Sequence, residues 1–204
     1  MRTLASILFL TVSTLAPAAD DLLGQGEFRY QVVPDWGREA LAKVNVKSGH
    51  AVVIDSKGRL LFLTDDARNN VVILDAESGA LITHWTARMP GAHGMSLVRD
   101  ADGSEVLFIT DTQLHQVRKL TLDGKELAVY PWPAEANLHA KDAEYRPSKT
   151  IHFKDGSFAV FDGYGKDYIF HYKADGSLLR TWGGDLGEEK DRLKHWGPHG
   201  GAFD

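Results

Sequence analysis

One phrase recurs along this chain and constrains its fold more than any other feature. It reads GHAVVID at residues 49–55, AHGMSLV at 92–98 and RPSKTIH at 146–152, and PHGGAFD at 198–204 begins it again. Each of the first three opens an apolar, alternating run that ends near an aspartate, namely Asp65, Asp111 or Asp162. A repeat of about 40–50 residues, built from short strands and Gly or Asp turns, is typical of β-propeller blades.

Each repeat contains short runs rich in Val, Ile, Leu and Phe, joined by turn dipeptides such as Asp123-Gly124 and Asp175-Gly176. Such runs and turns predict an antiparallel meander of up to four strands per repeat. The expected strands are residues 51–54, 60–64, 71–74 and 81–85; then 106–110, 116–121 and 127–130; then 158–161, 169–172 and 178–182. We therefore predict an all-β protein, a β-propeller with little helix.

Three repeats and the opening of a fourth do not close a ring of about four to eight blades. Natural proteins avoid leaving long strand edges unpaired. We expect residues 49–204 to be the front part of a longer propeller, preceded by a lead-in segment at residues 20–48. Two copies that complete one another are the alternative.

The N-terminus has the pattern of a secretory signal peptide at residues 1–19. Arg2 precedes an apolar stretch at residues 4–15, and small residues at 16–19 offer a cleavage site. The apolar stretch is too short to cross a bilayer, and no later one is longer. The pattern predicts a secreted or periplasmic protein without a membrane span; a buried N-terminal helix is the alternative.

Composition excludes several classes of site. With 23 basic and 28 acidic residues and a formal charge of −5, the chain has no basic stripe for nucleic acid. It has no cysteine, which excludes disulfides, thiolate metal sites and a cysteine nucleophile. Any metal must be held by His, Asp, Glu or backbone oxygens.

Three histidines open innermost strands at the same position of the phrase, namely His50, His93 and His199. Innermost strands of a propeller begin near its axis, so these side chains should converge although they are far apart in sequence. Neutral imidazoles suit zinc, and three of them leave a fourth position open for water or substrate. The pattern predicts either a metal site or a set of polar hydrogen-bonding groups at the mouth of a funnel.

The stretch TDTQLHQVRK at residues 110–119 resembles the peptidyl-α-hydroxyglycine α-amidating lyases, a family of six-bladed propellers with NHL repeats. The motifs AHG at 92–94, DGY at 162–164 and PHG at 198–200 resemble the same family, in the same order along the chain. The similarity covers about residues 49–204.

This resemblance implies a zinc ion held by three histidines from separate blades, with a tyrosine and an arginine acting on the substrate. By position, His93 and His199 match two zinc ligands and Tyr164 matches the catalytic tyrosine. The third family histidine would lie beyond Asp204. A structural calcium, held by backbone carbonyls near the position of Met95, is also implied.

The sequence departs from the family at several positions. Asp65 stands where the family has its arginine, with Arg68 three residues further on. Gly165 follows Tyr164 where the family has a cysteine, and His50 has no counterpart among the family's ligands. The prediction is a secreted, metal-dependent lyase that takes a small-molecule or peptide substrate at the funnel mouth. The alternative is a non-catalytic extracellular propeller that binds a peptide, sugar or protein.

Other prominent residues have structural interpretations. Asp111 and Asp162 precede tight turns and should accept hydrogen bonds from backbone N–H groups there. His115 should form a hydrogen bond between blades. The aromatic residues that close outer strands should pack between blades; they are Trp85, Tyr130 and Trp182.

Overall fold

The computed structural model describes residues 22–186 and 196–202. The chain divides into two compact units, Met1–Asp35 and Trp36–Asp204. In the first unit, β1 (Leu22–Gln25) and β2 (Phe28–Gln31) form an antiparallel hairpin. The signal peptide predicted at residues 1–19 lies outside the described residues.

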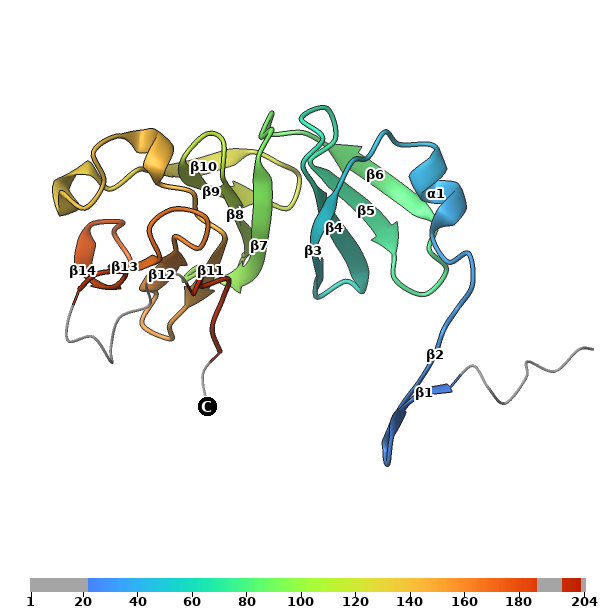
Figure 1. The fold of residues 1–204 in the computed structure, drawn as a ribbon. Helices are drawn as coiled ribbons and strands as arrows, with labels where there is room; N and C mark the ends of the chain where they lie inside the picture. The colour runs from blue at the N-terminus through green and yellow to red at the C-terminus, as the bar shows by residue number, and fades with distance from the viewer. Residues whose placement is uncertain (1–21, 187–195, 203–204) are drawn as a thin grey trace, which may run out of the picture. The chain divides into compact units, whose positions relative to one another are not determined.

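The second unit contains three antiparallel sheets of four strands each (Figure 1). The first consists of β3 (Gly49–Ile54), β4 (Arg59–Thr64), β5 (Val71–Asp75) and β6 (Leu81–Trp85). The second consists of β7 (Ala92–Arg99), β8 (Glu105–Asp111), β9 (Gln116–Thr121) and β10 (Glu126–Pro131). The third consists of β11 (Lys149–His152), β12 (Phe158–Phe161), β13 (Tyr168–Tyr172) and β14 (Leu178–Gly183).

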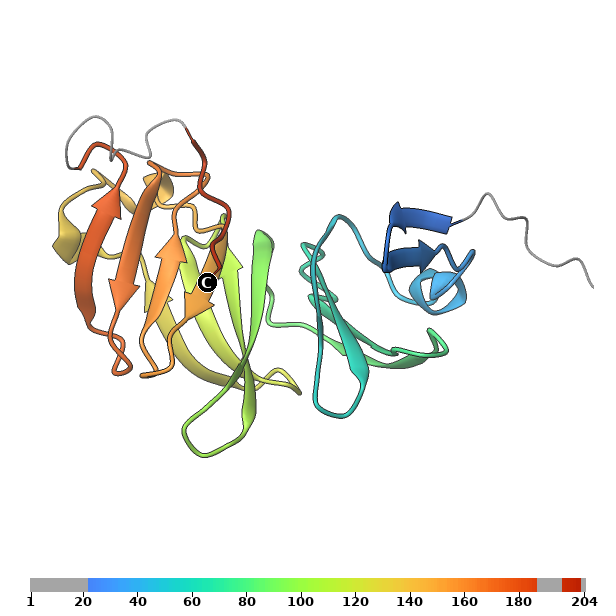
Figure 2. The same cartoon turned by 90° about the horizontal axis from the view of Figure 1, so that it is seen from below.

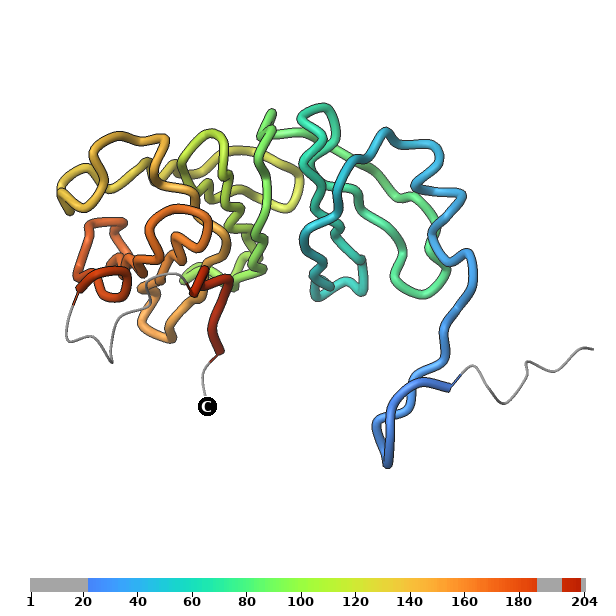
Figure 3. The backbone as a smooth tube through the Cα atoms, viewed as in Figure 1, coloured from blue at the N-terminus to red at the C-terminus, as the bar shows by residue number. Residues whose placement is uncertain are grey.

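Strand order follows sequence order in every sheet, so each sheet is a meander that the chain completes before it enters the next (Figures 2 and 3). The first strands of the sheets are neighbours, because β7 contacts both β3 and β11. This is the arrangement of propeller blades, and it confirms the predicted all-β, propeller-type fold. The fourth phrase begins without a strand, since residues 196–202 have none.

Helix is confined to short segments in the described residues. Helix α1 (Arg38–Ala42) packs on the first sheet, where Ala40 and Val44 join Val72 and Leu74 in one cluster. Part of the predicted lead-in is therefore built onto the first blade. The connection from β10 to β11 contains two 3₁₀ turns, η2 (Ala134–Ala136) and η3 (Asp142–Glu144). Within residues 22–186 and 196–202, no helix has the length and apolar character to span a bilayer.

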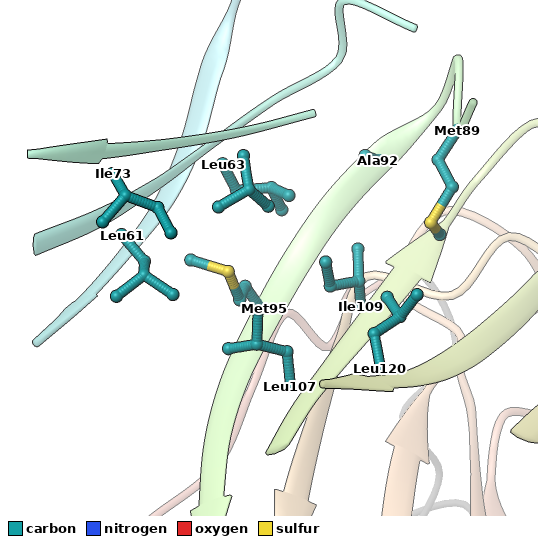
Figure 4. Packing of buried hydrophobic residues seen from close by; sticks show 10 residues of the cluster. Leu61, Leu63, Ile73, Met89, Ala92, Met95, Leu107, Ile109 and Leu120 are labelled. Carbon is teal, nitrogen blue, oxygen red and sulfur yellow. The ribbon is translucent and has the colours of Figure 1, made fainter. Parts of the chain in front are cut away.

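The core lies between the faces of neighbouring sheets. Figure 4 shows Leu61, Leu63 and Ile73 of the first sheet opposite Met95 and Leu107 of the second, all of them buried. A second cluster, rich in aromatic residues, joins the second and third sheets. Alternation of apolar residues along each strand supplies both faces.

One kind of contact recurs between neighbouring sheets, in which an aromatic side chain packs against a glycine turn. Trp85 at the end of β6 donates from Nε1 to the Leu122 carbonyl, 3.0 Å away, and a Cβ added at Gly124 would lie 2.7 Å from its ring. Tyr130 at the end of β10 lies in the same way over Gly176, 2.8 Å from where a Cβ would stand. We call these contacts the aromatic–glycine joints. They confirm the predicted packing roles of Trp85 and Tyr130.

A third joint comes from residues that precede the first sheet. The Trp36 indole donates from Nε1 to the Glu77 carbonyl at 3.3 Å, and a Cβ at Gly79 would lie 3.2 Å from its ring. Trp36 therefore contacts the first sheet as Trp85 contacts the second. Trp182 packs within its own sheet instead, with Ile169 and His171.

Candidate functional site

Two of the predicted site histidines lie in β-bulges at the start of innermost strands. The pairing of β3 with β4 shifts register between Gly49 and Ala51, which places His50 in the irregularity. The pairing of β7 with β8 shifts between Ala92 and Met95, which places His93 in a second one. A bulge redirects the side chain of the extra residue. The two imidazoles leave their strands at the same end, on neighbouring blades.

The structure brings together the four predicted site residues. The ring centroids of His50 and His93 are 4.7 Å apart, and that of His199 is 5.8 Å from His93. The Tyr164 ring lies 5.0 Å from His93 and 4.4 Å from His199, edge-on to both. These residues are up to 149 positions apart (199 − 50) and come from the starts of β3 and β7, the turn after β12 and the segment at residues 196–202.

Hydrogen bonds define the tautomer of His93. Its Nδ1 lies 3.0 Å from the Ser148 carbonyl, which accepts only, so Nδ1 carries the hydrogen. Nε2 then has a free lone pair, and the Tyr164 hydroxyl, 3.1 Å away, donates to it. Burial lowers the pKa of His93, partly offset by the Ser148 contact, and the neighbouring His50 and His199 lower it further. The imidazole is therefore neutral near pH 7.

His199 has the same arrangement. Its Nδ1 lies 2.5 Å from the Gly197 carbonyl, so its Nε2 is also the nitrogen without the hydrogen. The Ser148 hydroxyl donates to the Pro198 carbonyl at 2.9 Å and holds this segment beside β11. His93 and His199 thus each direct Nδ1 at a backbone carbonyl, the orientation that metal-ligating histidines usually show.

A cavity of about 140 Å³ adjoins three of the four predicted site residues. It is lined by His50, Asp65, Gly91, Ala92, His93, Thr112, Gln113, Arg146 and Tyr164. A larger cavity, of about 900 Å³, lies between the outer parts of the first two sheets and contains none of the predicted site residues. The smaller cavity is the one that adjoins the predicted site residues.

Arg146 is the site residue that sequence reasoning missed. Its guanidinium carbon lies 6.0 Å from the centre of the Tyr164 ring, and its side chain lines the cavity. Among the described residues, no carboxylate pairs with it. The available signal was its position, because Arg146 opens the third phrase where the others have glycine, alanine or proline.

The two residues at the position of the family's arginine behave differently. Arg68 pairs with Asp66 at 2.7 Å, and its side chain is 68% exposed. Asp65 accepts from the Ser48 N–H at 3.0 Å and lies 3.7 Å from His50 Nε2. The arginine that lines the cavity comes from the segment before β11, not from the first sheet.

The aspartates and His115 have the predicted structural roles. Asp111 Oδ1 accepts from the Gln113 and Leu114 N–H groups, both at 2.8 Å. Asp162 accepts from the Arg146 N–H at 2.7 Å and the Lys166 N–H at 2.8 Å. His115 Nδ1 lies 2.7 Å from the Tyr145 carbonyl, in the connection between the second and third sheets. All three interpretations are confirmed.

The donor set fits zinc in part. His93 and His199 supply two imidazole nitrogens with the orientation a metal requires. In the part of the chain that the structure describes, no group of three or more His, Cys, Asp or Glu side chains is arranged to hold a metal ion. His50 is a neighbour of His93, but its Nε2 is directed toward Asp65. A metal would need a further donor.

The residues around Met95 do not fit calcium. The Lys149 ammonium donates to the Met95 carbonyl at 2.6 Å, so a positive group of the chain itself is already at that oxygen. A divalent cation there would lie beside a like charge.

Comparison with known proteins gives one relative by sequence and several by structure. Peptidyl-alpha-hydroxyglycine alpha-amidating lyase 2 of Drosophila melanogaster is 30% identical over 115 residues, which is 55% of this chain and 27% of that protein. The chain thus spans about a quarter of the length of this relative. No family model matches the chain.

Among solved structures, a streptogramin B lyase superimposes with a TM-score of 0.51 at 17% identity, over 71% of this chain and 43% of that one. A catalytically inactive variant of virginiamycin B lyase from Staphylococcus aureus, solved with quinupristin, gives a TM-score of 0.48 at 17% identity. It covers 66% of this chain and 40% of that one, and is too distant to carry an argument. The chain is a propeller-type protein that resembles the amidating lyases.

Proposed function

We propose that this chain carries part of a metal-dependent lyase site that cleaves peptides ending in α-hydroxyglycine. The observation that carries the proposal is the hydrogen bond of 3.1 Å between Tyr164 Oη and His93 Nε2, beside His199. It joins a proton-transfer group to a neutral imidazole at the mouth of a small cavity. The partial sequence similarity to an amidating lyase supports the substrate class. We further propose that the repeats are of the NHL type and that the protein is exported.

In this proposal, His93 and His199 would hold zinc through Nε2, and a third donor would complete the site. At His93 the zinc would take the Nε2 lone pair that otherwise accepts from Tyr164, which would leave the Tyr164 hydroxyl free to act on the substrate. Zinc bound there would act as a Lewis acid that lowers the pKa of the substrate hydroxyl. Tyr164, which already lies against both imidazoles, would move the hydroxyl proton. Arg146, whose guanidinium carbon lies 6.0 Å from the centre of the Tyr164 ring, would bind the substrate carboxylate, since guanidinium matches carboxylate geometry.

The proposed reaction is an elimination that balances without a co-reactant. The hydroxyl of the α-hydroxyglycine loses its proton and becomes the carbonyl of glyoxylate. The bond between the α-carbon and the amide nitrogen breaks, and that nitrogen keeps the electron pair and takes up a proton. Tyr164 can serve both transfers, because the proton removed from oxygen equals the one delivered to nitrogen.

A second candidate is a non-catalytic propeller that binds a peptide, sugar or protein in the same cavity. It is favoured by the lack of a three-ligand group among the described residues. In that case His93 and His199 serve as hydrogen-bonding groups. The two candidates differ in metal binding and in turnover.

The test measures zinc binding by calorimetry and conversion of an α-hydroxyglycine peptide to its amide by chromatography. His93→Ala and His199→Ala should weaken zinc binding by more than the roughly 10–100-fold typical of an outer-shell partner. Tyr164→Phe should retain zinc and lower kcat about 10²–10⁴-fold. His84→Ala, on the exposed strand β6, is the control and should change neither.

The outcomes separate the candidates. Zinc binding with turnover supports the lyase, and zinc binding without turnover indicates a different reaction at the same metal. Wild-type protein that binds no zinc on titration and converts no substrate would leave the ligand-binding propeller.

A further inference from the structure

We propose that His139 is a positioning residue that fixes Tyr164 and Arg146 at the candidate site through a buried contact with Asp162. His139 Nε2 lies 2.8 Å from Asp162 Oδ2, and both side chains are fully buried. His139 belongs to the connection between β10 and β11, whereas Asp162 follows β12. The contact therefore ties this connection to the turn that carries Tyr164. The inference rests on the proposed function only for its kinetic test.

The Asp162 carboxylate binds the backbone of Arg146 and the turn that carries Tyr164. Oδ1 accepts from the Arg146 N–H at 2.7 Å, and Oδ2 accepts from the Lys166 N–H at 2.8 Å in addition to His139. The Tyr164 N–H donates to the Arg146 carbonyl at 3.3 Å. A displacement of this carboxylate would move the backbone of both residues.

The turn wraps closely around the carboxylate. A Cβ added at Gly165 would lie 2.0 Å from Asp162 Oδ1, so only glycine fits there. This explains why Gly165 follows Tyr164. Because the turn packs so tightly on this carboxylate, a shift of the Asp162 side chain should also shift Tyr164.

His139 makes this contact at an energetic cost. Its ring is 5.8 Å from the rings of Tyr145, Tyr168 and Phe170, and its Nδ1 has no hydrogen-bond partner among the described residues. A phenyl ring would fill the same apolar space without an unsatisfied nitrogen. What only the imidazole supplies is the N–H that reaches Asp162.

A second contact, at the surface, joins the connection between β10 and β11 to the turn that carries Tyr164. Lys166 Nζ lies 2.6 Å from Glu144 Oε2 and 3.4 Å from the Leu138 carbonyl. The turn is thus held from inside by His139 and from outside by Lys166. The outer contact is partly exposed and should contribute less than the buried one.

The experiment compares His139→Phe, which keeps the ring and removes the N–H, with His139→Gln, which restores an amide donor. The control is His171→Phe. His171 is also buried, its Nε2 lies 3.0 Å from Ser157 Oγ, and its Nδ1 has no partner among the described residues. It lies in the same sheet, on β13, but contacts no site residue.

The first readout is the NMR signal of the labelled Tyr164 ring, assigned by its loss in Tyr164→Phe. His139→Phe should shift it, because the ring would move relative to two imidazoles, while His139→Gln and His171→Phe should leave it near the wild-type position. The proposal is overturned if His139→Phe leaves the signal unchanged or if His171→Phe shifts it equally.

Should His139→Phe not fold, Asp162→Asn decides, since it keeps the size of the side chain but replaces the oxygen that accepts from His139 with an amide group. It should shift the Tyr164 signal. An unshifted signal in a folded Asp162→Asn protein would contradict the proposal.

The second readout is kinetic. His139→Phe should lower kcat about tenfold to a hundredfold, because a misplacement of about 1 Å has effects of this size, and should raise KM, because Arg146 moves with Tyr164. Zinc content should stay at the wild-type level. If the wild-type protein does not turn over the substrate, the proposed function fails, but the NMR comparison still tests the positioning role.

Discussion

At the residue scale, Lys149 places a positive charge where the resemblance implies a calcium ion. It reaches from β11 to the Met95 carbonyl on β7, and burial lowers the pKa of its ammonium group. The contact joins the innermost strands of two blades. A tethered cation does not dissociate, so this joint does not depend on the calcium concentration.

We predict that neither millimolar calcium nor a calcium-selective chelator changes the Tm of the wild-type protein. Lys149→Met leaves the Met95 carbonyl without its donor and should destabilise the protein by about 1–3 kcal/mol. Lys154→Met, an exposed lysine two residues beyond the same strand, is the control and should be near neutral. Thermal unfolding measures all of these. A Tm that rises with calcium in the wild type would mean that the native state binds it.

The repeated phrase located His50, His93 and His199, because a side chain that opens an inner strand can be recognised from its place in a repeat. Tyr164 was found only through the family motif. Arg146 was missed because it lies at the first position of the phrase, but an arginine is unlike the residues that the other repeats have there. His139 was beyond prediction, since a buried pair between residues 23 apart leaves no pattern in the sequence.

At the scale of elements, the strand predictions agree with the structure to within about two residues at each end. Positive φ at Gly124 and Gly176 ends each strand at a definite point, which is why these boundaries were predictable. The connection between β10 and β11 carries no such signal. It holds two 3₁₀ turns and buries His139, because its apolar residues pack between the second and third sheets.

The aromatic–glycine joint between Trp85 and Gly124 can be measured by a matched pair of substitutions. Gly124→Ala and Gly103→Ala both place a side chain at positive φ, +88° and +85° respectively. Only at Gly124 would the new Cβ meet the Trp85 ring, since nothing lies within 4 Å at Gly103. We expect Gly124→Ala to cost about 1–3 kcal/mol more than Gly103→Ala, the range for overpacking. Equal losses of unfolding free energy in urea would show that the joint contributes nothing.

At the scale of the whole molecule, stability should fall when the solution is acidified. Burial lowers the pKa of His152 to about 4, helped by the charges of Lys119 and Lys149. The unfolded chain takes up this proton near its ordinary pKa of about 6.5, whereas the folded chain does not until about pH 4. The stability that the neutral His152 contributes is therefore fully present above pH 6.5 and is lost as the pH falls toward 4. His93 and His171 shift in the same direction.

We expect the free energy of unfolding to fall by up to about 3 kcal/mol for His152 over this range. His152→Phe, which keeps an aromatic ring beside Phe108 and Phe158, should flatten the dependence. His84→Ala, exposed on β6, should not. Denaturant unfolding at pH 4.5 and pH 7 makes the comparison, and a His152→Phe profile as steep as that of the wild type would contradict it.

The overall architecture was predictable because a blade is defined by local signals repeated at a fixed interval. The boundary of the compact unit was not, since Trp36 contacts a glycine turn more than 40 residues away. Its sequence surroundings do not resemble those of Trp85, so the equivalence of the two contacts appears only in three dimensions.

At His50 and His93, the bulges separate two tasks of a strand residue, which are to pair its backbone with the neighbouring strand and to present a functional side chain. The extra residue of a bulge stands outside the ladder of paired N–H and C=O groups. Its side chain can therefore be exchanged while the ladder bonds within the blade remain. At His93 a substitution also removes the contact of Nδ1 with the Ser148 carbonyl, so His50 is the position at which a new side chain disturbs the scaffold less.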